Sequence, residues 1–185
     1  RYLDPMLGMW ISVDAARQVD SPYLYMGNGA NPIISTNTDG NIVLAATRKD
    51  QQAYAAWTKT LNKSEAEVVS RIEKSDIVVN WRLTDQPIKT MNNDPKTFEP
   101  MTAGGVTTGV DGERALNVTI FKGDLKNSGM HEFYHVDQAN DFLQSDSKHT
   151  GTDWNKEYKA NTLDYELDAY NRDGVNVTRE DLKEG

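Results

Sequence analysis

Apolar residues recur with a helical period in the segment 45–61, and this pattern predicts a helix. The apolar positions lie three or four residues apart among good helix formers. They are Ala53, Ala56, Trp57 and Leu61. Ser64 and Glu67 fit a capping box, in which two side chains satisfy free amide groups at the start of a helix. We therefore expect a second helix from Ser64 to about Lys74.

Runs of β-branched and aromatic residues predict three strands further along the chain. The first strand is expected at 77–83. A hairpin is expected from 106–110 and 115–121, joined at Asp111-Gly112, a dipeptide suited to a tight turn. The segment 86–101 carries three prolines and is expected to be a loop.

The last third of the chain shows helical periodicity again. Apolar residues recur at 130–142, where Ser128 is the expected N-cap, and again at 154–173. A final helix is expected after Thr178. The order of helix, helix, strand, loop, hairpin and further helices predicts an α+β fold with a small sheet.

Composition restricts the classes of function. The 185 residues carry a net charge of −8, which disfavours phosphate contacts, so nucleic acid is not an expected partner. No run approaches the roughly 18 apolar residues of a membrane span. The chain has no cysteine, so a metal ion would need histidine and carboxylate ligands. It begins at Arg1 without a methionine or a signal peptide, which indicates a piece of a longer protein.

The pattern His-Glu-x-x-His at 131–135 is the strongest chemical signal in the chain. Residues four apart lie one above the other on a helix, so His131 and His135 can direct imidazole nitrogens at one metal ion. Glu132 is placed to bind water at the metal, which is the general-base role in zinc hydrolases. Two of the three histidines of the chain lie in this pattern.

A catalytic zinc ion normally has three protein ligands, so a third is expected outside this pattern. Glu166, in the predicted helix 154–173, is our prediction for that ligand. The alternatives are Glu157, Asp168 and His149. Because successive helical residues are about 100° apart, the three acidic residues cannot all face one ion.

Further side chains are candidates for catalysis or for ligand orientation. His149 or Tyr170, and also Tyr165, could stabilise the oxyanion formed in hydrolysis. Asp168 could orient a ligand imidazole through its ring N–H. The ordinary alternatives are an exposed loop histidine and tyrosines packed between helices.

The candidate site resembles that of zincin-type metallopeptidases. Glu166-Leu167-Asp168-Ala169 is similar to the Glu-x-x-Ala pattern on the second ligand-bearing helix of many peptidases with His-Glu-x-x-His, including toxin domains attached to Rhs cores. Zincins also place a small sheet, with one strand at the edge of the cleft, before the metal-binding helix. The resemblance implies a zincin-like fold, bound Zn²⁺, and a protein or peptide substrate paired with an edge strand.

Residues 1–40 resemble the terminal core segment of Rhs/YD-repeat proteins, whose pattern runs R-Y-Y-D-P-x-x-G-R-[FW]-[IL]-S-x-D and then N-x-Y-x-Y-x-x-N-N-P. This chain reads RYLDPMLGMWISVD from Arg1, and SPYLYMGN followed by Asn31-Pro32. The family then has Asp-Pro-x-Gly, a junction associated with self-cleavage by aspartate chemistry. Here the chain reads Asn37-Thr38-Asp39-Gly40, so release by that route does not carry over directly.

Together the two resemblances imply the C-terminal end of a polymorphic toxin. Residues 1–40 would be the end of the Rhs core, and residues 41–185 a zincin-like zinc metallopeptidase toxin domain. They further imply a secreted or cell-surface bacterial protein that is delivered into a target cell. The rest of the Rhs shell and an immunity protein would be its partners. The alternatives are an inactive domain that works by binding, and a metal-dependent hydrolase of a cell-wall amide.

Overall fold

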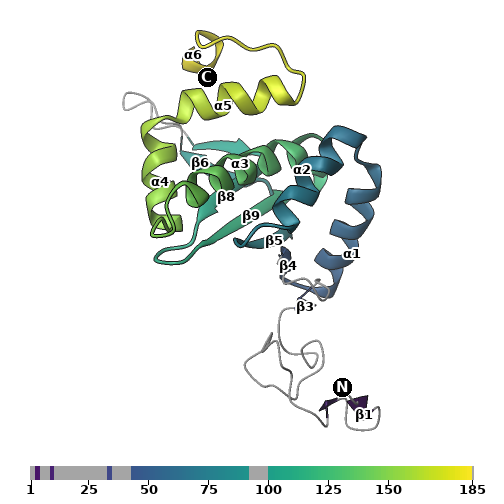
Figure 1. Cartoon of the computed structure of the whole chain (residues 1–185). Coiled ribbons are helices and arrows are strands. Elements are labelled where there is room, and N and C mark those ends of the chain that lie inside the picture. The colour runs from purple at the N-terminus through teal and green to yellow at the C-terminus, as the bar shows by residue number, and fades with distance from the viewer. Residues whose placement is uncertain (1–2, 5–8, 11–32, 35–42, 92–99, 185) are drawn as a thin grey trace.

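The computed structural model describes residues 3–4, 9–10, 33–34, 43–91 and 100–184 (Figure 1). Within this part of the chain the largest sheet has five strands. In spatial order they are β3 (Ile33–Ile34), β4 (Val43–Ala45), β5 (Val78–Thr84), β9 (Ala115–Phe121) and β8 (Gly105–Gly109). The central strands β4, β5 and β9 are parallel, whereas β3 and β8 at the edges are antiparallel to their neighbours. This mixture of helices and a small mixed sheet is compatible with the predicted α+β class.

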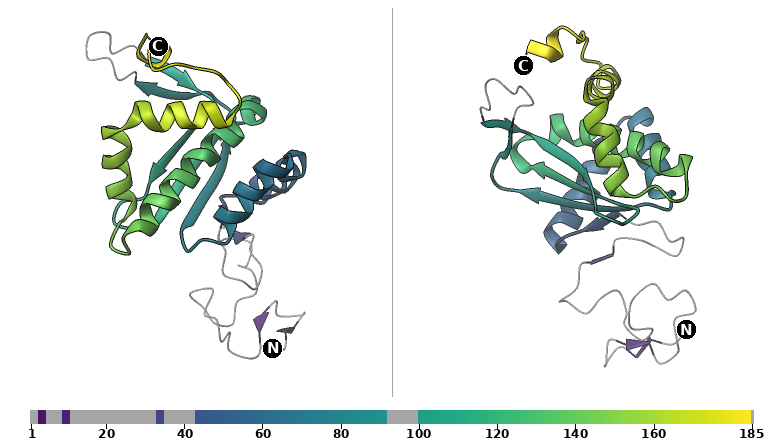
Figure 2. Two further views of the ribbon diagram at one scale, coloured as in Figure 1. Left: turned by 45° about the horizontal axis from the view of Figure 1, so that its top comes forward. Right: turned by 90° about the vertical axis from the view of Figure 1, so that its left-hand side faces the viewer.

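The helices pack against one another and against β4, β5, β8 and β9. They are α1 (Arg48–Trp57), η1 (Thr58–Thr60), α2 (Lys63–Glu73), η2 (Lys122–Asp124), α3 (Leu125–Ser145), α4 (Gly151–Ala160), α5 (Thr162–Arg172) and α6 (Asp181–Glu184). α1, η1 and α2 lie between β4 and β5 in the chain, and the other helices follow β9. In the left view of Figure 2, α3, α4 and α5 form three sides of a triangle. No described helix combines the length and the apolar character needed to cross a membrane.

The core lies between one face of the sheet and the helices α1 and α3. Trp81 of β5 pairs with Val118 of β9, so their side chains lie on the same face of the sheet. Both side chains are fully buried. The ring of Tyr54 in α1 lies 5.4 Å from that of Trp81 and 6.0 Å from that of Phe133 in α3. This aromatic cluster fixes α3 on the sheet, with another side of the helix left to meet α5.

The predicted capping box of the second helix is wrong by two residues. Asn62 is the N-cap of α2, and its side chain accepts a hydrogen bond from the amide of Glu65. The carboxylate of Glu65 accepts a hydrogen bond from the amide of Asn62 at 2.7 Å, which completes the box. Ser64 and Glu67 have the same spacing, but they lie inside the helix.

Two other helix predictions also need correction. Ser128 is not an N-cap, because α3 begins at Leu125 and the Ser128 hydroxyl donates to the carboxylate of Asp124. The segment 154–173 is not one helix, because the chain breaks at Asn161 between α4 and α5. This break turns the second half of the segment toward α3.

The three predicted strands are confirmed to within one residue as β5, β8 and β9. The hairpin between β8 and β9 is longer than a two-residue turn, and Gly112 in it has a positive φ of 74°. The predicted loop 86–101 is partly wrong, since β6 (Ile88–Met91) and β7 (Pro100–Ala103) pair antiparallel within it. Pro100 is the first residue of its strand, a position where proline is tolerated.

Little of the first forty residues falls within the described part of the chain. Leu3 and Trp10 pair in a short antiparallel ladder of β1 (Leu3–Asp4) and β2 (Met9–Trp10). The junction Asn37-Thr38-Asp39-Gly40 lies outside the described residues. The strand β3 precedes residue 40 and still pairs with β4, so the largest sheet includes a strand from each side of the predicted domain boundary. The boundary itself stays a prediction.

Candidate active site

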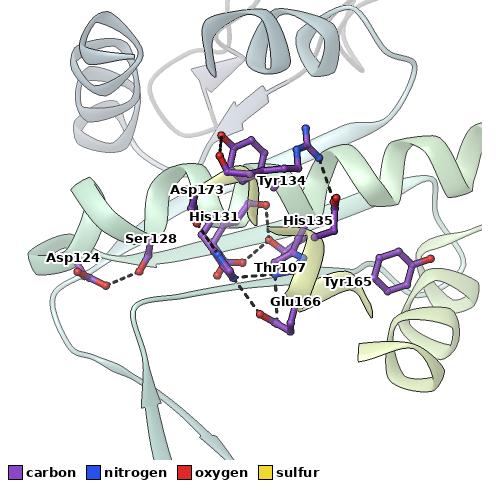
Figure 3. Close-up of polar contacts among 12 residues, drawn as sticks. Thr107, Asp124, Ser128, His131, Tyr134, His135, Tyr165, Glu166 and Asp173 are labelled. Atoms are coloured by element: carbon purple, nitrogen blue, oxygen red, sulfur yellow. Dashed lines mark hydrogen bonds and ion pairs between the residues drawn. The ribbon is translucent and has the colours of Figure 1, made fainter. Parts of the chain in front are cut away.

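Three predicted metal ligands converge between α3 and α5 (Figure 3). His131 and His135 are one helical turn apart on α3, and their Nε2 atoms lie 3.2 Å from each other. The Glu166 carboxylate, from α5, lies 3.2 Å from the Nε2 atom of His131 and 3.4 Å from that of His135. The structure thus brings together the ligand set predicted from the sequence.

These three residues fit a zinc ion. A tetrahedral ion with bonds of about 2.0–2.1 Å keeps its ligand atoms roughly 3.4 Å apart. The two Nε2 atoms, 3.2 Å apart, have this spacing. Glu166 contacts them through different oxygens, with Oε2 at 3.2 Å from His131 and Oε1 at 3.4 Å from His135, and one ligand atom from each residue lies within 4.8 Å of the others. Two imidazoles and one carboxylate are also a known ligand set of catalytic zinc.

The electrostatics of the cluster reflect the close approach of opposite charges. Burial alone would lower the pKa of His131, but hydrogen bonds to Asp173 and Glu166 outweigh it and raise that pKa to about 10. Burial would raise the pKa of Glu166, but hydrogen bonds with His131 and His135 hold it well below its usual range. The pocket around Glu166 therefore favours a positive charge, whether a proton or a metal cation.

Contacts behind the ligands fix the orientation of both imidazole rings. The Nδ1 atom of His131 lies 2.8 Å from the carboxylate of Asp173, and that of His135 lies 2.9 Å from the Oε1 atom of Gln138. Because each Nδ1 faces an acceptor, each ring presents its Nε2 lone pair to the cluster. Gln138 in turn donates to Asp168 at 2.7 Å.

Asp173, rather than Asp168, therefore makes the predicted contact with the ring nitrogen of a ligand histidine. Asp168 instead contacts Gln138, which contacts His135. Sequence reasoning missed Asp173, although a signal for it exists. Asp173 follows Glu166 by seven positions, which is two helical turns and returns to the same side of α5. Tyr170 lies on that side as well, one turn after Glu166.

Glu132 is held against β8 beside the metal ligands. Its side chain is buried, and its carboxylate accepts a hydrogen bond of 2.7 Å from the hydroxyl of Thr107. Burial raises the pKa of Glu132 above its ordinary value, against the opposing effects of His135 and Thr107. A Cβ atom at Gly105 would lie 2.4 Å from Cγ of Glu132, so only glycine lets the strand approach this closely.

Two tyrosines border the cluster. The hydroxyl of Tyr158 in α4 donates to Glu166, and its ring lies 5.4 Å from that of His135. Tyr170, predicted to act on the oxyanion, lies at the site, with its ring 4.6 Å from that of His131. Burial raises the pKa of Tyr170, so its hydroxyl keeps its proton and can donate. Sequence reasoning had treated Tyr158 only as an apolar position of a helix.

The remaining candidates lie outside the cluster. The ring of His149 stacks at 4.3 Å on that of Phe142, which lies in the last turn of α3. Its position therefore does not support the predicted catalytic role of His149. Glu157 accepts hydrogen bonds from Tyr165 and Asn161, so neither Glu157 nor Tyr165 reaches the ligands. About 15 Å of helix separates His135 from the end of α3, which explains why the loop histidine cannot join them.

A cleft of about 1340 Å³ opens at the cluster. His131, Glu132 and Glu166 lie in its wall. Away from them, much of its apolar lining comes from α1, from the residue after η1 and from the first turns of α3. These residues are Ala53, Ala56, Trp57, Leu61, Leu125 and Met130. The cluster is therefore accessible to a ligand much larger than water.

Comparison of the chain with models of protein families, with curated proteins and with solved structures finds no match. The case for a function therefore rests on the residues of the site and on their geometry.

Proposed function

We propose that this chain contains a zincin-like, zinc-dependent hydrolase of amide bonds. The observation that carries the proposal is the convergence of His131, His135 and Glu166, with Glu132 beside them at the end of an open cleft. A cluster of this kind combines metal ligands with a separate acid–base residue, which is what metal-assisted hydrolysis requires.

The residues have distinct roles in this mechanism. His131, His135 and Glu166 would hold Zn²⁺, which as a Lewis acid lowers the pKa of water and polarises a carbonyl group. Glu132 accepts a proton from the attacking water and passes it to the leaving nitrogen. Its pKa, raised by burial, suits a group that must both take and give a proton. The hydroxyl of Tyr170 is available to the developing oxyanion.

A peptide is the substrate class that the fold supports best. β8 is an edge strand, and Thr107 in its middle contacts Glu132. An extended peptide can pair with such an edge through main-chain hydrogen bonds, which would bring its carbonyl groups to the site. The antiparallel edge strand, followed by β9 and the helix α3, supports the proposal of a zincin-like arrangement.

We further propose that the domain is the toxin tip of an Rhs-type protein. The support is the sequence pattern of residues 1–40, followed by a different kind of domain at 41–185. In this context the protein would be secreted or exposed at a bacterial surface and delivered into a target cell. An immunity protein would then protect the producing cell from the hydrolase.

Metal content tests the proposal directly. Wild type purified without chelators is expected to carry about one zinc per chain, as measured by mass spectrometry, because a single cluster of ligands is present among the described residues. His135→Ala and Glu166→Ala are expected to lose it, whereas Glu157→Ala, on the neighbouring helix, should keep it. A wild type that neither contains nor takes up zinc would overturn the proposal. Zinc without any peptide hydrolysis would favour the inactive binding domain.

Gly105→Ala is expected to reduce hydrolysis about 100-fold while zinc is retained, because small displacements of catalytic groups have effects of this size. The added Cβ would press on Cγ and Oε1 of Glu132, at 2.4 and 2.7 Å. Initial rates and zinc content of the variant check this. Thr108→Ala, an exposed position of the same strand, serves as the control and should behave like wild type. Equal rates in Gly105→Ala and wild type would contradict the role given to Glu132.

A further inference from the structure

We infer that the cleft accepts the amino-terminal end of a peptide rather than its middle, and that Asn155 is the residue that stops the peptide. This inference rests on the proposed function and specifies its substrate. It starts from the outer edge of β8, which pairs with no other strand of the described residues and is interrupted at one end.

The hydrogen bonds of β8 define which of its main-chain groups face outward. The carbonyl of Gly104 accepts from the amide of Phe121, and the amide of Val110 donates to the carbonyl of Ala115. In an antiparallel ladder the intervening alternate residues point the other way. The N–H and C=O groups of Gly105, Thr107 and Gly109 therefore point toward the edge where a peptide would bind.

Asn155 occupies this edge at Gly109. Its Oδ1 atom accepts a hydrogen bond of 2.7 Å from the amide of Gly109, and its Nδ2 atom donates to the carbonyl of Gly109 at 3.0 Å. One carboxamide thus makes the two hydrogen bonds that the next strand would otherwise make. Only Gly105 and Thr107 are left to pair with a peptide.

The obstruction is a fixed part of the fold. A Cβ atom at Gly109 would lie 2.0 Å from the carbonyl oxygen of Gly151, so α4 begins in direct contact with the end of β8. Thr152 anchors the same end, since its hydroxyl accepts from the amide of Gly112 and donates to Asp111. Tyr158, one turn after Asn155, continues this wall to Glu166.

The cleft itself extends in the other direction. Its lining includes Gly104 and Gly105 but no residue of α4, all of which lies in the described part of the chain. From the cluster it runs past the first turns of α3 toward α1. A bound peptide therefore has ample space on the Gly105 side and space for about two residues between Thr107 and Gly109.

The direction of the peptide follows from strand pairing. β8 runs from Gly105 toward Gly109 at α4. A peptide paired antiparallel, the commoner and more stable arrangement, has its amino end on the α4 side. Hydrolysis beside Glu132 would then release one or two residues from the amino terminus.

The test uses the full chain loaded with zinc and a mixture of synthetic decapeptides of varied sequence with free termini. Mass spectrometry locates each cut, and zinc content is measured in the same samples. Wild type is expected to cut within two residues of the amino terminus. Asn155→Ala should raise the rate at bonds further inside by about tenfold or more, because two hydrogen-bonding groups of Gly109 become available to the peptide.

Controls separate the possible failures. Lys156→Ala, at the exposed neighbouring position, should cut as wild type does, and Asn155→Ser replaces the alanine variant if circular dichroism shows that the latter does not fold. Cuts by wild type in the middle or at the carboxyl end of the peptides would overturn the inference and leave the proposed hydrolase intact. A folded Asn155 variant that cuts only where wild type does would overturn it as well. A zinc-loaded wild type that cuts no peptide would overturn both the inference and the proposed function.

Discussion

Glu132→Gln is expected to reduce hydrolysis by about 10²–10⁴-fold, the usual contribution of a general base, without loss of zinc. Glutamine has nearly the same shape and can still contact the hydroxyl of Thr107, but it cannot accept a proton from water. Rates on the peptide mixture, zinc content and thermal unfolding should be measured on one preparation.

The matched control is Glu157→Gln on α4, which makes the same chemical change outside the cluster. It is expected to retain wild-type rates. If Glu132→Gln keeps full activity, another group takes the proton, and the mechanism proposed for this site is wrong.

Removing both arginines around Asp137 is expected to lower the free energy of unfolding by about 3–5 kcal/mol, the usual penalty of an unpaired buried charge. Asp137 in α3 is 1% exposed, and its Oδ2 atom contacts Arg71 of α2 and, at 2.7 Å, Arg172 of α5. Either arginine alone still pairs with the carboxylate. The single variants Arg71→Met and Arg172→Met should therefore cost less, and their sum should fall short of the double variant.

Urea unfolding of the two single variants and the double variant measures this coupling. Adding Asp137→Leu to the double variant should restore stability, because it removes the buried charge itself. Arg179→Met breaks an exposed pair with Asp164 and is expected to change stability by less than about 1 kcal/mol. If the losses of unfolding free energy in the two single variants add up to that of the double variant, the carboxylate of Asp137 is hydrated once both arginines are removed.

Local geometry explains which parts of the site the sequence could predict. His131 and His135 share one helix turn, so their spacing alone places them together. Glu132 lies in the same helical turn, so its position near the two histidines could be predicted as well. Glu166 was found through its resemblance to a known pattern, and the structure brings it to the two histidines.

The contact of Tyr158 with Glu166 could not be predicted, because it depends on a break in the chain. Eight residues in one continuous helix span about 12 Å, too far for a hydrogen bond. The predicted single helix 154–173 therefore excluded the contact. The break at Asn161 changes the direction of the chain and brings the hydroxyl to the carboxylate.

The errors in helix boundaries have a similar origin. Ser64 and Glu67 satisfy the capping pattern as well as Asn62 and Glu65 do, so the pattern alone cannot choose between them. Ser128 is a good capping residue by type, but Asp124 and a preceding turn start α3 earlier. Such choices depend on where the neighbouring elements pack, which a local pattern does not contain.

The way in which α5 is attached has a consequence for when the proposed hydrolase would become active. Ala169 is the only residue of this helix that is buried, so α5 adheres to α3 mainly through polar side chains, including Glu166, Asp168 and Arg172. A zinc ion shared by the two helices would add the strongest of these attachments. In the proposed hydrolase, the local supply of zinc, rather than the amount of chain present, would then set the time at which hydrolysis begins.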